Sequence, residues 1–191
     1  MLPPRSLLEA EIVALYEEYS VGLTRYGAAF IECADQAADA VQDAFLGYFA
    51  ERSCGRIVEC PRSWLYQSLR NYLGQRLATA SGTDEIGDKS LSRITDPAGD
   101  PEDQLHRAEI ARKIAGSLSA RERECLGLRS EGLSYIEIAD VMGLRIGTVG
   151  ALLARAHQKI RTAAGDAGAK DTHVAGAVYH LFRGGEFCPS N

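Results

Sequence analysis

The sequence predicts an all-α protein: two small helical domains joined by a flexible linker, the second being a helix-turn-helix domain. Apolar residues recur at steps of three and four along most of the chain, which is the period of an amphipathic helix. No stretch alternates polar and apolar residues in the way of a strand. Residues 81–103 break the helical period with a segment rich in Gly, Pro, Ser and Asp, which predicts a linker between two domains.

Composition and charge limit the possible functions. The chain has 191 residues, of which 46% are apolar, and this is enough to bury helical cores. Its net charge of −5 is unevenly distributed, because residues 104–165 hold ten basic and six acidic residues and are the one segment with a positive balance. A positive balance is what contact with DNA phosphates requires.

The first domain, residues 1–80, is predicted to contain four helices. Ser6 can cap a helix over Leu7–Val21, and a second apolar run covers Leu23–Cys33. Asp35 can cap a third helix, in which every third or fourth residue is apolar. The members of this stripe are Val41, Ala44, Phe45, Tyr48 and Phe49.

A loop over Glu51–Cys60 is predicted to follow, because Gly55 and the loss of the apolar period mark a break there. Pro61 then begins a fourth helix that ends near Ala80, since proline is favoured in the first turn of a helix. The linker over residues 81–103 is acidic. Its surplus of carboxylates fits a solvated tether, and binding in a basic channel of a partner is the alternative.

The second domain, residues 104–165, begins with a helix over Leu105–Leu118. Ser119 and Glu122 have the spacing of a capping box, in which each side chain satisfies a backbone N–H of the other. This pair predicts the start of the next helix. That helix is predicted to stop at Gly132.

A helix-turn-helix is predicted to complete this domain. Ser134 can cap the helix YIEIADVM, Gly143 supplies a left-handed turn, and the last helix runs from about Gly147 to Thr162. Such a helix is the form that enters a DNA major groove, although three helices with a glycine turn can also be purely structural. Residues 166–191 form a C-terminal extension with a short helix, which either packs on its own domain or docks on the first domain or a regulator.

Several classes of protein are disfavoured. The five cysteines form no C-x-x-C pair, and no metal site is predicted. The chain shows neither a charged leader nor a long apolar run, so we expect a cytoplasmic protein without membrane insertion. No nucleophile with a base, paired-carboxylate cleft or phosphate-binding glycine loop is evident. We therefore expect no enzyme, no cofactor and no small-molecule substrate.

Three motifs, in this order, carry a resemblance to a known family. They are ADAVQDAFLGYF, PRSWLYQSLRNYLGQRL and LSARERECLGLRSEGLSYIEIADVMGLRIGTVGALLARAHQKI. The first resembles the acidic polymerase-binding helix of the extracytoplasmic-function group of bacterial RNA polymerase sigma factors, and the second resembles the helix that follows it. The third resembles their domain that reads the upstream promoter element. The resemblance covers roughly Leu15 to Arg161.

The resemblance implies a role for individual residues. The polymerase-binding face would comprise Asp39, Gln42, Asp43 and Phe45. Arg52 and Arg56, in the loop after that helix, would help to receive a base flipped out of the minus-ten element, and Asn71 and Arg76 would contact the melted strand. The residues implied in binding promoter DNA upstream are Arg145, Thr148, Arg155, His157, Lys159 and Arg161.

The last helix departs from the family pattern. Gly150, Ala151, Leu152 and Ala154 stand where the resemblance implies basic or polar residues facing the groove, which weakens sequence-specific reading. Arg145 stands where a Ser or Thr cap is expected.

The resemblance therefore implies a sigma factor that binds core RNA polymerase and promoter DNA, supports DNA opening and is held by an anti-sigma factor. Two alternatives remain: a sigma-like interaction protein with weakened promoter reading, and a conventional helix-turn-helix transcriptional regulator.

Overall fold

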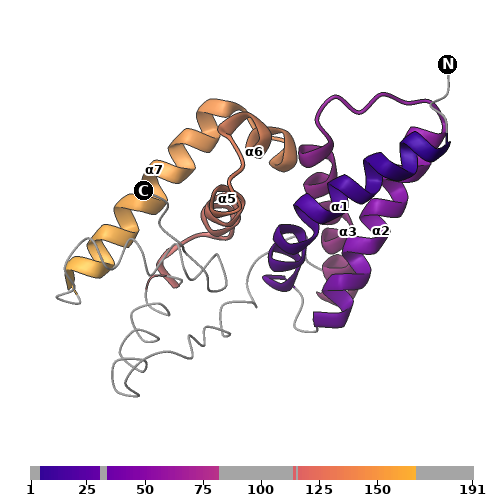
Figure 1. Ribbon diagram of the computed structural model, residues 1–191. Coiled ribbons are helices and arrows are strands. Elements are labelled where there is room, and N and C mark those ends of the chain that lie inside the picture. The colour runs from indigo at the N-terminus through magenta and orange to yellow at the C-terminus, as the bar shows by residue number, and fades with distance from the viewer. Residues whose placement is uncertain (1–4, 31–33, 82–113, 115, 167–191) are drawn as a thin grey trace, which may run out of the picture. The chain divides into compact units, whose positions relative to one another are not determined.

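The computed structural model describes residues 5–30, 34–81, 114 and 116–166, and the secondary structure in these ranges is entirely helical (Figure 1). The helices are α1 (Arg5–Ala28), α2 (Ala34–Ser53), α3 (Pro61–Ser81), α5 (Ala120–Ser130), α6 (Tyr135–Met142) and α7 (Ile146–Asp166). The chain divides into two compact units. The first comprises residues 1–86 with 136–144, and the second comprises residues 87–135 with 145–191.

The core of the first unit is formed by α1, α2 and α3, each of which packs against the other two (Figure 1). Its largest fully buried side chains come from all three helices. They are Leu23, Val41, Tyr48, Leu65, Tyr66, Leu69 and Leu73. Edge-to-face ring contacts join Tyr26 to Tyr66, with centroids 5.5 Å apart, and Tyr48 to Trp64, with centroids 5.6 Å apart. Such contacts stabilise the bundle beyond the burial of their area.

The first helix is continuous, so the prediction of two helices separated near Gly22 was wrong. Leu8, Leu23 and Tyr26 are all buried, and their spacing places them on one face of a single helix. The hydroxyl of Thr24 donates to the carbonyl of Ser20 at 2.8 Å across the predicted break. Burial of this face outweighs the cost of about 1 kcal/mol for a glycine inside a helix.

The second helix is shifted relative to its predicted borders. Asp35 lies in its first turn and is not its N-cap, although a carboxylate there still interacts favourably with the helix dipole. The helix continues to Ser53, so the predicted loop over Glu51–Cys60 is shorter. Gly55 then takes φ +79°, a left-handed conformation that glycine adopts without strain and that turns the chain toward α3.

The second unit is built on the packing of α5 against α7. The predicted capping box is confirmed, because the N–H of Glu122 donates to the Ser119 hydroxyl at 3.3 Å and the N–H of Ser119 donates to the Glu122 carboxylate at 2.8 Å. The predicted stop at Gly132 is also confirmed, since α5 ends at Ser130 and Gly132 has φ +82°. Buried side chains from both helices form the core: Cys125, Leu126, Leu128, Val149, Leu152, Leu153, Ala156 and Ile160.

Helix α6, the turn at Gly143 and the start of α7 match the prediction closely. Helix α6 covers the residues of YIEIADVM, and it ends with the N–H of Leu144 donating to the carbonyl of Ala139 at 2.9 Å. Gly143 takes φ +64°. Helix α7 begins at Ile146, one residue before the prediction, and continues to Asp166. The predicted linker, most of the predicted helix before Ser119 and the C-terminal extension lie outside the described residues.

We predict opposite effects of alanine at two glycines. Gly150 lies inside α7, and a β-carbon there would lie 4.0 Å from Cε2 of Tyr135, an ordinary van der Waals distance. Gly150→Ala should therefore raise the free energy of unfolding by about 1 kcal/mol. Gly143→Ala should lower it by about 1 to 2 kcal/mol, because a β-carbon is strained at this positive φ. Urea denaturation of both variants tests this, and equal effects would contradict it.

Candidate functional site

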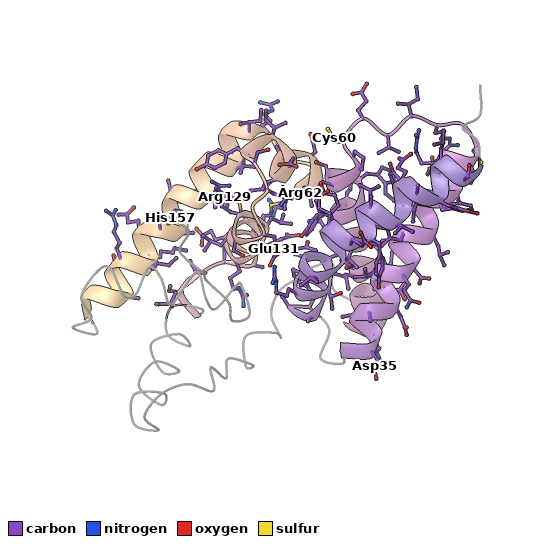
Figure 2. All side chains as sticks on the ribbon, in the orientation of Figure 1. Asp35, Cys60, Arg62, Arg129, Glu131 and His157 are labelled. Carbon is purple, nitrogen blue, oxygen red and sulfur yellow. The ribbon has the colours of Figure 1, made fainter. Side chains whose placement is uncertain are left out.

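One face of α2 is acidic and exposed. Asp39, Gln42 and Asp43 recur at helical spacing and are all exposed, and Asp35 extends the face at the start of the helix (Figure 2). Three carboxylates and an amide along one surface form a strip that suits a basic partner. The predicted polymerase-binding residues other than Phe45 therefore lie together on an accessible surface.

Phe45, by contrast, belongs to the core. Its side chain is 5% exposed, and its ring packs against that of Tyr16 with centroids 5.1 Å apart. The apolar residue on the exposed face of α2 is instead Leu46, which is 65% exposed. Leu46 lies three residues after Asp43 and four after Gln42, so the three share one helix face. The helical period indicates that Phe45 is buried and Leu46 exposed, because Phe45 belongs to the predicted apolar stripe and Leu46 lies on the opposite side of the helix.

The end of α2 is held by a network centred on Glu11 of α1. Its carboxylate accepts hydrogen bonds from the Tyr48 hydroxyl at 2.7 Å and from two nitrogens of Arg52, each at 3.1 Å. The hydrogen bonds from Arg52 hold the pKa of Glu11 below its ordinary value, although burial acts in the opposite direction. Burial and the bond to Glu11 raise the pKa of Tyr48. Arg52, which was predicted to help receive a flipped base, is thus hydrogen-bonded to Glu11 of the same chain.

Arg56 is the more accessible of the two arginines predicted for this loop. Its side chain is 71% exposed and donates to both carboxylate oxygens of Glu51, at 2.7 and 2.9 Å. An exposed ion pair of this kind contributes little stability, so Arg56 can exchange its partner for a phosphate at low cost. Asn71 on α3 is also exposed. Arg76 lies within α3, and its side chain is not among those described.

Trp64 has a packing role in the first turns of α3. Its ring contacts Tyr48 edge to face, and a β-carbon on Gly47 would lie 3.4 Å from its Cη2 atom. The small residue on α2 therefore accommodates the indole. Packing in the core of the first unit therefore accounts for Trp64.

Most of the predicted DNA-binding residues of α7 are exposed. Arg145 precedes the helix, and its carbonyl accepts the N–H groups of Thr148 and Val149 at 2.8 and 3.2 Å. Thr148 in the first turn and Arg161 near the far end are exposed as well. The backbone of Arg145 therefore begins the helix while its side chain stays accessible.

Two of the basic residues of α7, Arg155 and Lys159, lie near the carboxylate of Glu122 on α5. The side chain of Glu122 is 5% exposed, and its carboxylate accepts a hydrogen bond from Nζ of Lys159 at 2.7 Å, while Nε of Arg155 lies 3.9 Å away. Burial raises the pKa of Glu122, but the hydrogen bonds from Lys159 and Ser119 outweigh it and the pKa lies below its ordinary value. Lys159 is thereby engaged in joining α7 to α5. Arg155 remains 60% exposed.

His157 is exposed on α7 (Figure 2) and its Nδ1 lies 2.7 Å from the carbonyl oxygen of Leu153. A carbonyl can only accept, so Nδ1 carries the proton in this bond.

The small residues of α7 lie partly on its surface. Ala151 and Ala154 are exposed, as predicted from the sequence. Leu152 is 5% exposed and belongs to the core, which corrects the expectation that it faces the groove. The exposed surface of α7 thus combines alanines with Arg155, His157 and Arg161.

Within the described ranges, no three His, Cys, Asp or Glu side chains are placed to hold a metal ion. None of the described helices is long and apolar enough to cross a membrane.

Comparison with known proteins gives one family match and one similar solved structure. Residues 108–160 match the family model of sigma-70, region 4. The solved structure of the sigma factor RpoE from Bartonella quintana, in complex with the anti-sigma factor NepR, is similar in fold, with a TM-score of 0.56 and 22% sequence identity. The match covers 78% of this chain and 96% of that chain. No curated protein matches the sequence significantly. The all-α fold class with a helix-turn-helix domain is confirmed.

Glu122 predicts a pH dependence of stability. A carboxylate whose pKa is lowered by folding stabilises the folded state above its unfolded pKa and loses this effect as the pH falls through its folded pKa. Glu122→Gln should therefore cost about 1.5 to 3 kcal/mol at pH 7, the range for hydrogen bonds to a charged group. The difference from the wild type should shrink below a pH of about 4. Urea denaturation followed by circular dichroism at pH 7 and pH 3 measures both values, and a pH-independent difference would contradict the prediction.

Proposed function

Because the chain carries region 4 of the sigma-70 family and the fold of a sigma factor, we propose that it is a sigma factor of the extracytoplasmic-function type. It binds core RNA polymerase, directs the enzyme to a small set of promoters and helps to open the DNA. It acts as a dissociable subunit without catalysis or a cofactor of its own. Its place of action is the cytoplasm, where the polymerase works.

The observation that carries this proposal is the exposed acidic face of α2. Asp39, Gln42 and Asp43 precede Leu46 on the same helix face, and Leu46 is an apolar side chain that is 65% exposed. Interfaces gain most of their affinity from a few desolvated anchors, and charged residues around them contribute orientation and a fast encounter. The α2 face has both an apolar anchor, Leu46, and charged residues beside it. The partner that it fits is a basic surface of the polymerase with an apolar depression for Leu46.

The loop after α2 and the exposed side of α3 would bind the melted strand. Arg56 and Asn71 are accessible, and Arg76 lies farther along the same helix. Extrusion of a base costs a few kcal/mol, and polar groups beside a backbone-binding arginine offset this cost. Arg56 supplies the exposed charge in this arrangement, while Arg52 is engaged with Glu11.

The second unit would bind upstream duplex DNA. Arg145, Thr148 and Arg161 are exposed, and Arg155 is mostly exposed, so each is available to a phosphate or a base edge. His157 is exposed on the same helix. Lys159 contributes mainly by holding α7 on α5 through Glu122. The alanines on the same surface carry no charge, so specificity rests on few contacts.

An anti-sigma factor is the proposed regulator. The similar sigma factor structure contains one, NepR, and a protein that covers the acidic face of α2 would block polymerase binding. The small number of basic side chains on the exposed surface of α7 favours a second candidate function, a sigma-like interaction protein that binds polymerase without reading promoters. A conventional helix-turn-helix regulator is less favoured, because it leaves the α1–α3 bundle without a role.

Leu46→Ala tests the polymerase-binding face. Loss of a central apolar anchor should weaken binding to purified bacterial core RNA polymerase by about tenfold, which corresponds to about 1.4 kcal/mol. Fluorescence anisotropy with labelled full-length protein measures the dissociation constant. Circular dichroism of the variant should match the wild type, because Leu46 is exposed and contributes little to the core.

Leu7→Ala provides the matched control. Leu7 is 62% exposed on α1, close to the value for Leu46, but lies outside the proposed face. It should leave the dissociation constant unchanged. Equal losses from both variants would show that the α2 face is not the binding surface, and no binding by the wild type would contradict the proposed function itself.

A further inference from the structure

Glu11 lies at the start of a chain of hydrogen bonds that reaches the loop between α2 and α3. Its carboxylate binds Nε and one terminal nitrogen of Arg52, each at 3.1 Å, in a two-point contact that fixes the plane of the guanidinium. The other terminal nitrogen of Arg52 donates to the backbone carbonyl of Arg56 at 3.1 Å. The chain therefore runs from α1, through the end of α2, into the loop.

The guanidinium of Arg52 uses all three of its nitrogens in these contacts. Its side chain is 20% exposed, compared with 71% for Arg56. A direct DNA contact by Arg52 would have to break bonds to a carboxylate and to a carbonyl, whereas Arg56 exchanges one solvent-exposed partner. The two arginines have different tasks in this geometry, one internal and one external.

We propose that Glu11 is a positioning residue for DNA capture, acting through Arg52 on the loop that presents Arg56. This inference rests on the proposed function, because it concerns the loop that would receive the melted strand. Glu11 orients the guanidinium, the guanidinium holds the carbonyl of Arg56, and the backbone thereby keeps the Arg56 side chain at a fixed place on the surface. Fixing the loop beforehand lowers the entropy lost when DNA binds.

The backbone of the loop supports this assignment. The N–H groups of Gly55 and Arg56 donate to the carbonyls of Arg52 and Glu51 at 3.0 and 3.1 Å, and Gly55 has φ +79°. Arg52 thus binds the first residues of the loop through its own carbonyl and through its side chain. Loss of the Arg52 side-chain bond leaves the turn held by these backbone hydrogen bonds alone.

Two variants separate loop positioning from the stability of the bundle. Glu11→Gln removes the charge that orients the guanidinium, and Arg52→Lys keeps a cation opposite Glu11 but lacks the planar fork that reaches both partners. Hydrogen exchange of the Gly55 and Arg56 amides in the free full-length protein should become about tenfold faster in both variants. The amides of Leu69 and Leu73 in the core of α3 should change much less, because they report on global unfolding.

Two controls isolate the link to the loop. Glu17→Gln removes the same charge from an exposed position on α1, and Tyr48→Phe removes another hydrogen bond to the Glu11 carboxylate while leaving Arg52 in place. Neither should accelerate exchange in the loop relative to the core amides. Acceleration in these controls equal to that in Glu11→Gln would overturn the proposal.

The functional arm uses polymerase assembled with each variant and a fluorescent pool of random single-stranded DNA. Glu11→Gln and Arg52→Lys should weaken DNA binding about threefold to tenfold, the effect of one weakened contact to a charged group, with unchanged affinity for core polymerase. Unchanged loop exchange, or faster exchange with unchanged DNA binding, would overturn the positioning role. Failure of the wild type to bind polymerase would refute the proposed function and with it the role in DNA capture, while the exchange data still decide whether Glu11 anchors the loop.

Discussion

Burial of one face of α2 against α1 and α3 is the constraint on which the first unit depends. Phe45 and Tyr48 lie in the core on that face, and the helix geometry then fixes what lies opposite: Asp39, Gln42, Asp43 and Leu46. The same burial brings the hydroxyl of Tyr48 to Glu11, which in turn holds Arg52. Packing therefore determines both the surface proposed to bind polymerase and the position of the loop proposed to bind DNA.

The second unit uses a buried charge for a similar purpose. The Glu122 carboxylate accepts a hydrogen bond from the N–H of Ser119 at the start of α5 and another from Nζ of Lys159 on α7. One carboxylate thus stabilises a helix start and a contact between helices, and its hydrogen bonds offset the cost of burial. Two basic side chains of α7 therefore lie near a carboxylate of the same unit, because Lys159 is hydrogen-bonded to Glu122 and Nε of Arg155 is 3.9 Å from it.

Local signals in the sequence predicted much of this fold. The spacing of Ser119 and Glu122 predicted the start of α5, and Gly132 and Gly143 marked turns that need a positive φ. The continuity of α1 through Gly22 was not predictable in this way, because it depends on tertiary burial of Leu23 and Tyr26. The partners of Arg52 and Lys159 lie 41 and 37 residues away, so no local pattern indicates them. Phe45 was assigned to the surface by resemblance and to the core by periodicity, and the periodicity was correct.

We propose that this chain makes core RNA polymerase start transcription at particular promoters. The most direct measurement is transcription in vitro with purified bacterial core polymerase, the full-length protein and fragmented genomic DNA, with the 5′ ends of the transcripts sequenced. We predict discrete start sites that depend on the protein and share upstream sequence elements. Stable binding to core polymerase without any protein-dependent start site would contradict the claim and favour the sigma-like interaction protein.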